Sequence, residues 1–190
     1  MDYYIKSSLQ GYYSEEELEF TKRLYKYKDY RGRSDRDIWA DFTIELMQGI
    51  GKIEEKVPLR LREFHLVAVP RSHPQKFNPM AESIKMIGKL SSDGTSGCKR
   101  PLIDKSDLIE RTTPIREAHK SAYYGERRPD IPDHMASMRI TSNVNTSGVL
   151  YIIMDDIVSS GSSLWACANL LMIDGVPKNN IRFLTIGRTL

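Results

Sequence analysis

One stretch of the chain, residues 149–164, constrains the fold more than any other. It begins with the uninterrupted apolar run 149–154, which is rich in β-branched residues and predicts a strand buried on both faces. Two adjacent carboxylates, Asp155 and Asp156, follow, and then a serine-rich turn around Gly161. Apolar residues at helical spacing come next, so we expect a helix. This order of elements predicts the α/β class, with a central, mostly parallel sheet flanked by helices.

The turn after the acid pair has the composition of an anion site. Backbone N–H groups at a helix N-terminus bind phosphate, and a glycine lets the backbone approach it closely. Two carboxylates would repel a phosphate, but they suit the hydroxyls of a sugar. We therefore expect a ribose 5-phosphate group, with its sugar on Asp155 and Asp156 and its phosphate on Ser159, Ser160, Gly161, Ser162 and Ser163. The alternative is an ordinary strand-to-helix turn, which requires neither both acids nor all the serines.

The stretch from the apolar run to Ser163 resembles the motif by which type I phosphoribosyltransferases bind 5-phosphoribosyl 1-diphosphate (PRPP). The resemblance implies transfer of the phosphoribosyl group to a base or amine, with release of pyrophosphate. It also implies Mg²⁺ as the cofactor, held largely by the substrate, and no protein ligand for the metal is predicted. Asp155 and Asp156 would hold the ribose hydroxyls and stabilise positive charge that develops on the sugar.

The whole chain sets wider limits. Its 190 residues suggest one domain, and 40% hydrophobic with 28% charged residues is typical of a globular protein. No apolar run is long enough to span a bilayer, and the N-terminus does not look like a signal peptide. Cys98 and Cys167 have no metal-type spacing, and Cys167 is expected in the core, so we expect a reducing cytoplasm. A net charge of +3 is too small to indicate nucleic acid by itself.

The first part of the chain is expected to be helical. A capping box at Ser14 predicts a helix from Glu15, and a second helix is expected after Ser34, with Gly51 as its end. We expect residues 1–60 to form a helical hood over an α/β core of residues 61–190.

Two features of this region leave alternatives open. Lysines and arginines are frequent between residues 22 and 36; a solvated face is the simpler interpretation, and a surface that attracts phosphates or nucleic acid is the other. Trp39 and Phe42 are expected in the core, although an aromatic ring here could also line a base pocket.

A second strand, residues 64–69, leads into another ligand loop. Arg71 and Ser72 follow this strand, where parallel sheets bind ligands, and a helix is expected after Pro79. In type I phosphoribosyltransferases the corresponding loop holds pyrophosphate, and a guanidinium is suited to that anion. The resemblance therefore assigns pyrophosphate to Arg71 and Ser72; the alternative for Arg71 is a surface charge at a strand end.

A long segment separates the two ligand loops. Residues 91–99 are expected to be a loop, 107–111 a short strand, and 112–148 a long loop in which 115–124 could be helical. The resemblance places a mobile catalytic loop here, whose cations close over pyrophosphate. Lys120 and Arg127 are the candidates, while His119 and His134 are expected to be solvated. A final strand, 181–187, would complete a βαβ unit.

A looser similarity extends to the ComF-type competence family. It involves Lys26-Tyr27-Lys28, Val69-Pro70-Arg71-Ser72, Phe77-Asn78, Arg111-Thr112-Thr113 and Glu126-Arg127.

The acceptor and the catalytic status stay open. Phosphoribosyltransferases for 6-oxopurines resemble the motif but carry an Asp where Ser159 stands, so adenine, orotate, amine or unknown acceptors remain. The alternative function is a PRPP- or nucleotide-sensing regulatory protein, with nucleic acid as an optional partner. Neighbours in the superfamily are often dimers, so a homodimer is also considered. No membrane partner is expected.

Overall fold

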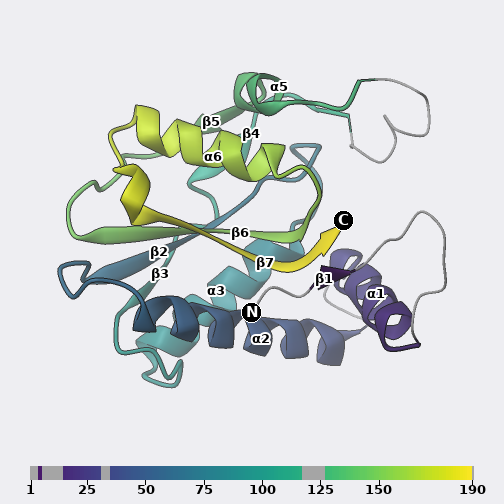
Figure 1. Ribbon diagram of the computed structural model, residues 1–190, viewed down its shortest axis with the longest axis horizontal. Coiled ribbons are helices and arrows are strands. Elements are labelled where there is room, and N and C mark those ends of the chain that lie inside the picture. The colour runs from purple at the N-terminus through teal and green to yellow at the C-terminus, as the bar shows by residue number, and fades with distance from the viewer. Residues whose placement is uncertain (1–3, 6–14, 31–34, 117–126, 190) are drawn as a thin grey trace.

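The computed structural model describes residues 4–5, 15–30, 35–116 and 127–189. Its centre is a five-stranded sheet in the order β1-β7-β6-β2-β3 (Figure 1). Every neighbouring pair in this sheet is parallel. The predicted α/β class with a central parallel sheet is therefore confirmed. The strands are β1 (Tyr4–Ile5), β2 (Glu63–Ala68), β3 (Leu102–Asp104), β6 (Val149–Val158) and β7 (Ile181–Thr189).

Helices cover both faces of the sheet (Figure 1). On one face lie α2 (Arg36–Glu55) and α3 (Pro79–Ser92), with α1 (Glu15–Lys28) beside them. On the other face lies α6 (Ser162–Ile173), followed by the short η1 (Lys178–Asn180). The remaining elements pack near α6: α5 (Ile131–Ala136) and an antiparallel pair, β4 (Ile109–Arg111) and β5 (Met138–Ile140).

The apolar run that begins β6 is buried on both faces, as predicted. Leu150 and Ile152 pack into the core beneath α2 and α3, and Tyr151 and Ile153 pack into the core beneath α6. Each of these side chains is at most 1% exposed. Burying an Ile or Leu in this way stabilises the fold by roughly 1.5–3 kcal/mol. This double burial fixes β6 in the middle of the molecule and leaves only its carboxyl end for chemistry.

Several predicted boundaries differ from the structure. The strand does not stop before the acid pair: β6 continues to Val158, because β7 pairs with it as far as Arg188. Gly51 does not end its helix, since α2 runs to Glu55 and the apolar face continues with Ile53. A glycine inside a helix costs only about 1 kcal/mol, which such packing offsets.

The segments predicted as loops hold additional structure. The helix α3 extends to Ser92, into the expected loop 91–99, and the three-residue strand β3 was not predicted. The expected long loop 112–148 contains α5 and β5. A capping box between Asp130 and Asp133 explains why a short helix forms there. The possible helix 115–124 lies almost entirely outside the described residues.

Hydrogen bonds between buried hydroxyl groups connect helix α1 to the rest of the fold. Tyr27, which is fully buried, has its hydroxyl 3.0 Å from Ser83 Oγ on α3. Ser83 Oγ lies 2.9 Å from Thr43 Oγ1 on α2. These bonds hold the last turn of α1 in a fixed position relative to the sheet. Trp39 and Phe42 are buried in the same core, and Cys167 lies in the core under α6, as predicted.

Candidate functional site

The order of the strands marks one crevice of the sheet. From β2 the chain moves outward to β3, and from β6 it moves outward in the opposite direction to β7. The direction therefore reverses between β2 and β6, and open α/β sheets bind ligands beyond the carboxyl ends of the strands at such a point. Two loops leave the sheet there: residues 69–78 after β2 and residues 159–161 after β6. Both were predicted to bind ligand.

Asp155 and Asp156 lie in β6, near its carboxyl end and beside this crevice. Asp156 is 8% exposed and Asp155 is half-buried. The Asp156 N–H donates to Asp155 Oδ1 at 2.9 Å, and the Ile157 N–H donates to Asp156 Oδ1 at 2.7 Å. Each carboxylate is thus oriented by the backbone N–H of the following residue, and its second oxygen remains for other partners.

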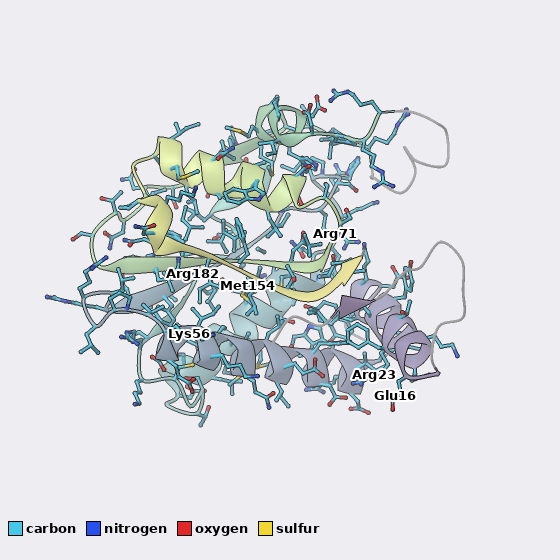
Figure 2. The ribbon with its side chains drawn as sticks, in the orientation of Figure 1. Glu16, Arg23, Lys56, Arg71, Met154 and Arg182 are labelled. Atoms are coloured by element: carbon cyan, nitrogen blue, oxygen red, sulfur yellow. The ribbon has the colours of Figure 1, made fainter. Side chains whose placement is uncertain are left out.

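Cations from two other elements converge on Asp156. Arg71 Nη1 donates to Asp156 Oδ2 at 3.1 Å, and Lys28 Nζ lies 3.8 Å from the same oxygen. Arg71 lies beside the carboxyl end of β6, while Lys56 and Arg182 are at the opposite end of the sheet (Figure 2). The last turn of α1, the loop after β2 and the end of β6 therefore meet at one carboxylate.

The two acids differ in their surroundings. Burial raises the pKa of Asp155 well above its usual range, and the charge of Asp156 raises it further. Asp156 has two cations as partners, whereas Asp155 accepts a hydrogen bond from a backbone N–H. A carboxyl group whose pKa is raised, as that of Asp155 is, is suited to exchange a proton.

The serine turn forms the start of α6. Gly161 has φ 76°, a left-handed conformation that favours glycine, and it precedes the first helical residue. Ser160 Oγ lies 2.9 Å from Ser162 Oγ and accepts from the Ser162 N–H at 3.3 Å. Ser159 and Ser160 are exposed, whereas Ser162 and Ser163 belong to the first turn of the helix and are half-buried. The turn thus presents hydroxyls and helix N–H groups together, which suits a phosphate.

A cationic cleft of about 590 Å³ lies between the loop after β2 and the antiparallel pair β4–β5. Arg71 lines it, but neither acid and none of the turn serines is among its lining residues. The charged side chains that line it are Arg71, Lys76, Glu110, Arg111 and Arg139. The cleft therefore adjoins the candidate site on the side of the predicted pyrophosphate loop.

The other predicted residues have varied positions. Ser72 follows Arg71 in the loop after β2, and its hydroxyl accepts from Lys76 Nζ at 3.5 Å. Arg127 is exposed and pairs with Asp130 and Asp133 at 2.6 and 2.8 Å. Lys120 and His119 lie outside the described residues. The prediction for His134 was wrong: it is half-buried in α5, and burial lowers its pKa.

Two residues of the site were not predicted as such. Lys28 was noted within a basic region and Arg111 at the end of an expected short strand; both also belong to the looser ComF-type similarity, but neither was assigned to the site. No spacing in the sequence connects residue 28 with residue 156, since the contact depends on how α1 packs. Arg111 is 5% exposed in the structure, and a strand of three residues gives almost no periodicity from which to predict that burial.

The donors present are compatible with a magnesium ion that a substrate brings. The described parts of the chain contain no group of three or more His, Cys, Asp or Glu that could form a protein cage for a metal. Mg²⁺ often binds through one or two carboxylates, several waters and substrate phosphates. Asp155 and Asp156 supply carboxylates of that kind next to the predicted pyrophosphate loop.

Comparison with known proteins gives no family. No family model matches the chain, and no curated protein matches it. In the described residues, no helix is both long and apolar enough to cross a membrane.

Proposed function

We propose that the protein is a PRPP-binding phosphoribosyltransferase that transfers the phosphoribosyl group to a base or amine and releases pyrophosphate. The observation that carries the proposal is the contact of Arg71 with Asp156 at 3.1 Å. It joins the loop after β2 to the acid-bearing strand at the point where the strand order reverses. Gly161 and the serines begin the helix that follows the same strand.

The substrate would be divided among three groups of residues. The 5-phosphate would bind to the turn at the start of α6, formed by Ser159, Ser160, Gly161, Ser162 and Ser163. The ribose hydroxyls would donate to Asp155 and Asp156. The pyrophosphate would lie on the loop that carries Arg71 and Ser72. The sheet order and the two ligand loops support a type I phosphoribosyltransferase fold, with the acceptor held from the side of α1.

The residues act mainly through charge and position. As the bond to pyrophosphate breaks, positive charge develops on the ribose ring, and the two carboxylates stabilise it. Burial raises the pKa of Asp155, and positive charge that develops beside this carboxyl group would favour its ionised form and oppose that rise. Mg²⁺, when bound through the substrate, neutralises pyrophosphate as a leaving group.

Lys120 and Arg127 are proposed to reach the pyrophosphate from the segment between β4 and β5. Arg127 would have to leave Asp130 and Asp133, which are exposed partners on the surface. Exposed ion pairs are weak, so exchanging them for a pyrophosphate group costs little. The Arg127→Met variant is expected to lower turnover and to leave the binding of ribose 5-phosphate unchanged.

The test is release of pyrophosphate from PRPP and Mg²⁺ in the presence of a panel of acceptors: adenine, orotate, ammonia and simple aromatic amines. We expect one acceptor to stimulate release, and the double variant Asp155→Asn/Asp156→Asn to abolish that stimulation. Release that survives the double substitution would contradict the roles given to the two acids.

A second candidate is a protein that binds PRPP or a nucleotide without transfer. The contacts of Asp156 favour it, because two cations already neutralise that carboxylate and reduce what it can offer to a positive sugar. Saturable binding of PRPP without turnover of any acceptor would support this candidate.

A further inference from the structure

A buried guanidinium connects the antiparallel pair β4–β5 to the loop after β2. Arg111 is the last residue of β4 and is 5% exposed. Its Nε donates to the Arg71 carbonyl at 2.6 Å and its Nη2 to the Pro70 carbonyl at 3.4 Å. Its Nη1 donates to the Oγ of Ser137, the residue between α5 and β5. All of these partners are carbonyl or hydroxyl oxygens, and no carboxylate of a described residue forms an ion pair with Arg111.

Burying a charge without a carboxylate is costly, and the burial lowers the pKa of Arg111. The guanidinium satisfies its donors with a fixed, planar set of contacts that a lysine cannot reproduce. These contacts contribute less to the stability of the fold than to the fixed position of the groups that they hold. The position that they determine is that of the loop after β2.

The contacts orient successive peptide units of that loop. The carbonyls of Pro70 and Arg71 accept from Arg111, and the next carbonyl, of Ser72, accepts from the Ile115 N–H at 2.8 Å. In a trans peptide unit the N–H points opposite to the carbonyl, and no cis peptide bond occurs among the described residues. The N–H groups of residues 71, 72 and 73 therefore point away from Arg111 and Ile115, which bind the carbonyls. A row of N–H groups with one orientation is an anion-binding arrangement.

The side chain of Arg71 leaves the same loop and contacts Asp156. The position of the Arg71 backbone, held by Arg111, thus also determines where its guanidinium meets the acid. Arg111 does not need to touch a ligand to influence both the loop amides and this ion pair.

We propose that Arg111 is a positioning residue: by holding the carbonyls of Pro70 and Arg71, it turns the loop N–H groups toward the pyrophosphate of the substrate and fixes the position from which the Arg71 side chain contacts Asp156. The inference rests on the proposed function, since that function supplies the pyrophosphate. Arg111 is expected to affect binding of the pyrophosphate end of the substrate and to leave binding of the 5-phosphate at the α6 turn unchanged.

The test compares two simple anions by calorimetry with the intact protein. Inorganic pyrophosphate in the presence of Mg²⁺ probes the loop after β2, and ribose 5-phosphate probes the α6 turn. We expect Arg111→Met to weaken pyrophosphate binding by about tenfold or more, and to change ribose 5-phosphate binding by less than about twofold. Arg111→Lys should not restore pyrophosphate binding, because one ammonium group cannot hold both carbonyls in the same geometry.

The matched control is Arg139→Met. Arg139 lines the same cleft and its loss changes the charge equally, but its guanidinium pairs with Glu110 at 2.6 Å, and no bond to the loop after β2 is observed. We expect pyrophosphate binding to fall by less than about threefold in this variant. An equal loss in the two variants would show that charge alone acts, and would overturn the proposal.

A second variant and a second measurement guard against simple unfolding of Arg111→Met. Ser137→Ala removes one partner of Arg111 and keeps the charge; it is expected to weaken pyrophosphate binding selectively. In NMR spectra, the amide signals of Arg71 and Ser72 should shift with pyrophosphate in the wild type and in Arg139→Met, and should shift less in Ser137→Ala. Unchanged shifts in Ser137→Ala would overturn the positioning role. A wild type that binds neither anion would instead overturn the proposed function.

Discussion

Arg71 and Asp156 are 85 residues apart in the chain, and the guanidinium of one donates to the carboxylate of the other at 3.1 Å. The parallel register explains the contact. Ala68, the last residue of β2, lies opposite Met154 in β6, so the loop after β2 begins beside the acids that follow Met154 in β6. Lys28 reaches the same carboxylate oxygen from α1. Three elements distant in sequence are thus joined at one acid.

Asp156 is expected to stabilise the fold through these contacts. The Asp156→Asn variant should lower the free energy of unfolding by about 1.5–3 kcal/mol, because Arg71 and Lys28 lose a charged partner. The control is Asp41→Asn, whose pair with Arg23 is exposed and should contribute less than about 1 kcal/mol. Urea unfolding at neutral pH measures both. Equal losses would show that the Asp156 contacts contribute no more than a surface pair.

The contribution of Asp155 to stability is expected to decrease as pH rises. Burial raises its pKa in the folded state above the unfolded value of about 3.9, so the folded protein binds this proton more tightly. Its contribution to stability is therefore present at low pH and is lost as pH rises through the folded pKa. An asparagine does not titrate. The stability of the wild type relative to Asp155→Asn should accordingly fall in urea unfolding as pH rises above the unfolded pKa of about 3.9, and a constant difference would contradict the raised pKa of this acid.

Position 161 is expected to require glycine, because its backbone adopts a left-handed conformation. A Cβ at this position would meet only ordinary contacts, at 3.6 Å from Val158 and 3.8 Å from Trp165, but φ is +76°. Gly161→Ala should therefore cost about 1–2 kcal/mol and weaken the binding of ribose 5-phosphate. Gly51→Ala is the control: its Cβ meets nothing within 4 Å inside α2, so it should stabilise the protein by about 0.5–1 kcal/mol. Thermal unfolding distinguishes the two, and a neutral Gly161→Ala would contradict the turn geometry.

The sequence predicted the unit from β6 to α6 because its signals are local. An apolar run, a glycine and helical spacing each act over a few residues, and the helix starts within the predicted turn. The extent of β6 depended instead on its partner β7, which continues beside it past the acids. Strand β3 was missed because three residues are too few to show a period of two.

The surroundings of the acids were harder to predict. The contact of Lys28 with Asp156 requires the packing of Tyr27 against Ser83, which no spacing in the chain specifies. The burial of Arg111 likewise follows from the antiparallel pairing of β4 with β5, which are distant in sequence. A cation in a polar segment is usually solvated, so composition alone favours the wrong environment for it.

Binding of PRPP to the purified protein is the most direct measurement of the site at the end of β6. In calorimetry with Mg²⁺, we expect saturable one-site binding to the wild type, weakened by about tenfold or more in Asp155→Asn/Asp156→Asn and weakened in Gly161→Ala. Absence of binding to the folded wild type, or binding that both variants retain in full, would contradict a sugar-phosphate site at this junction of strand and helix.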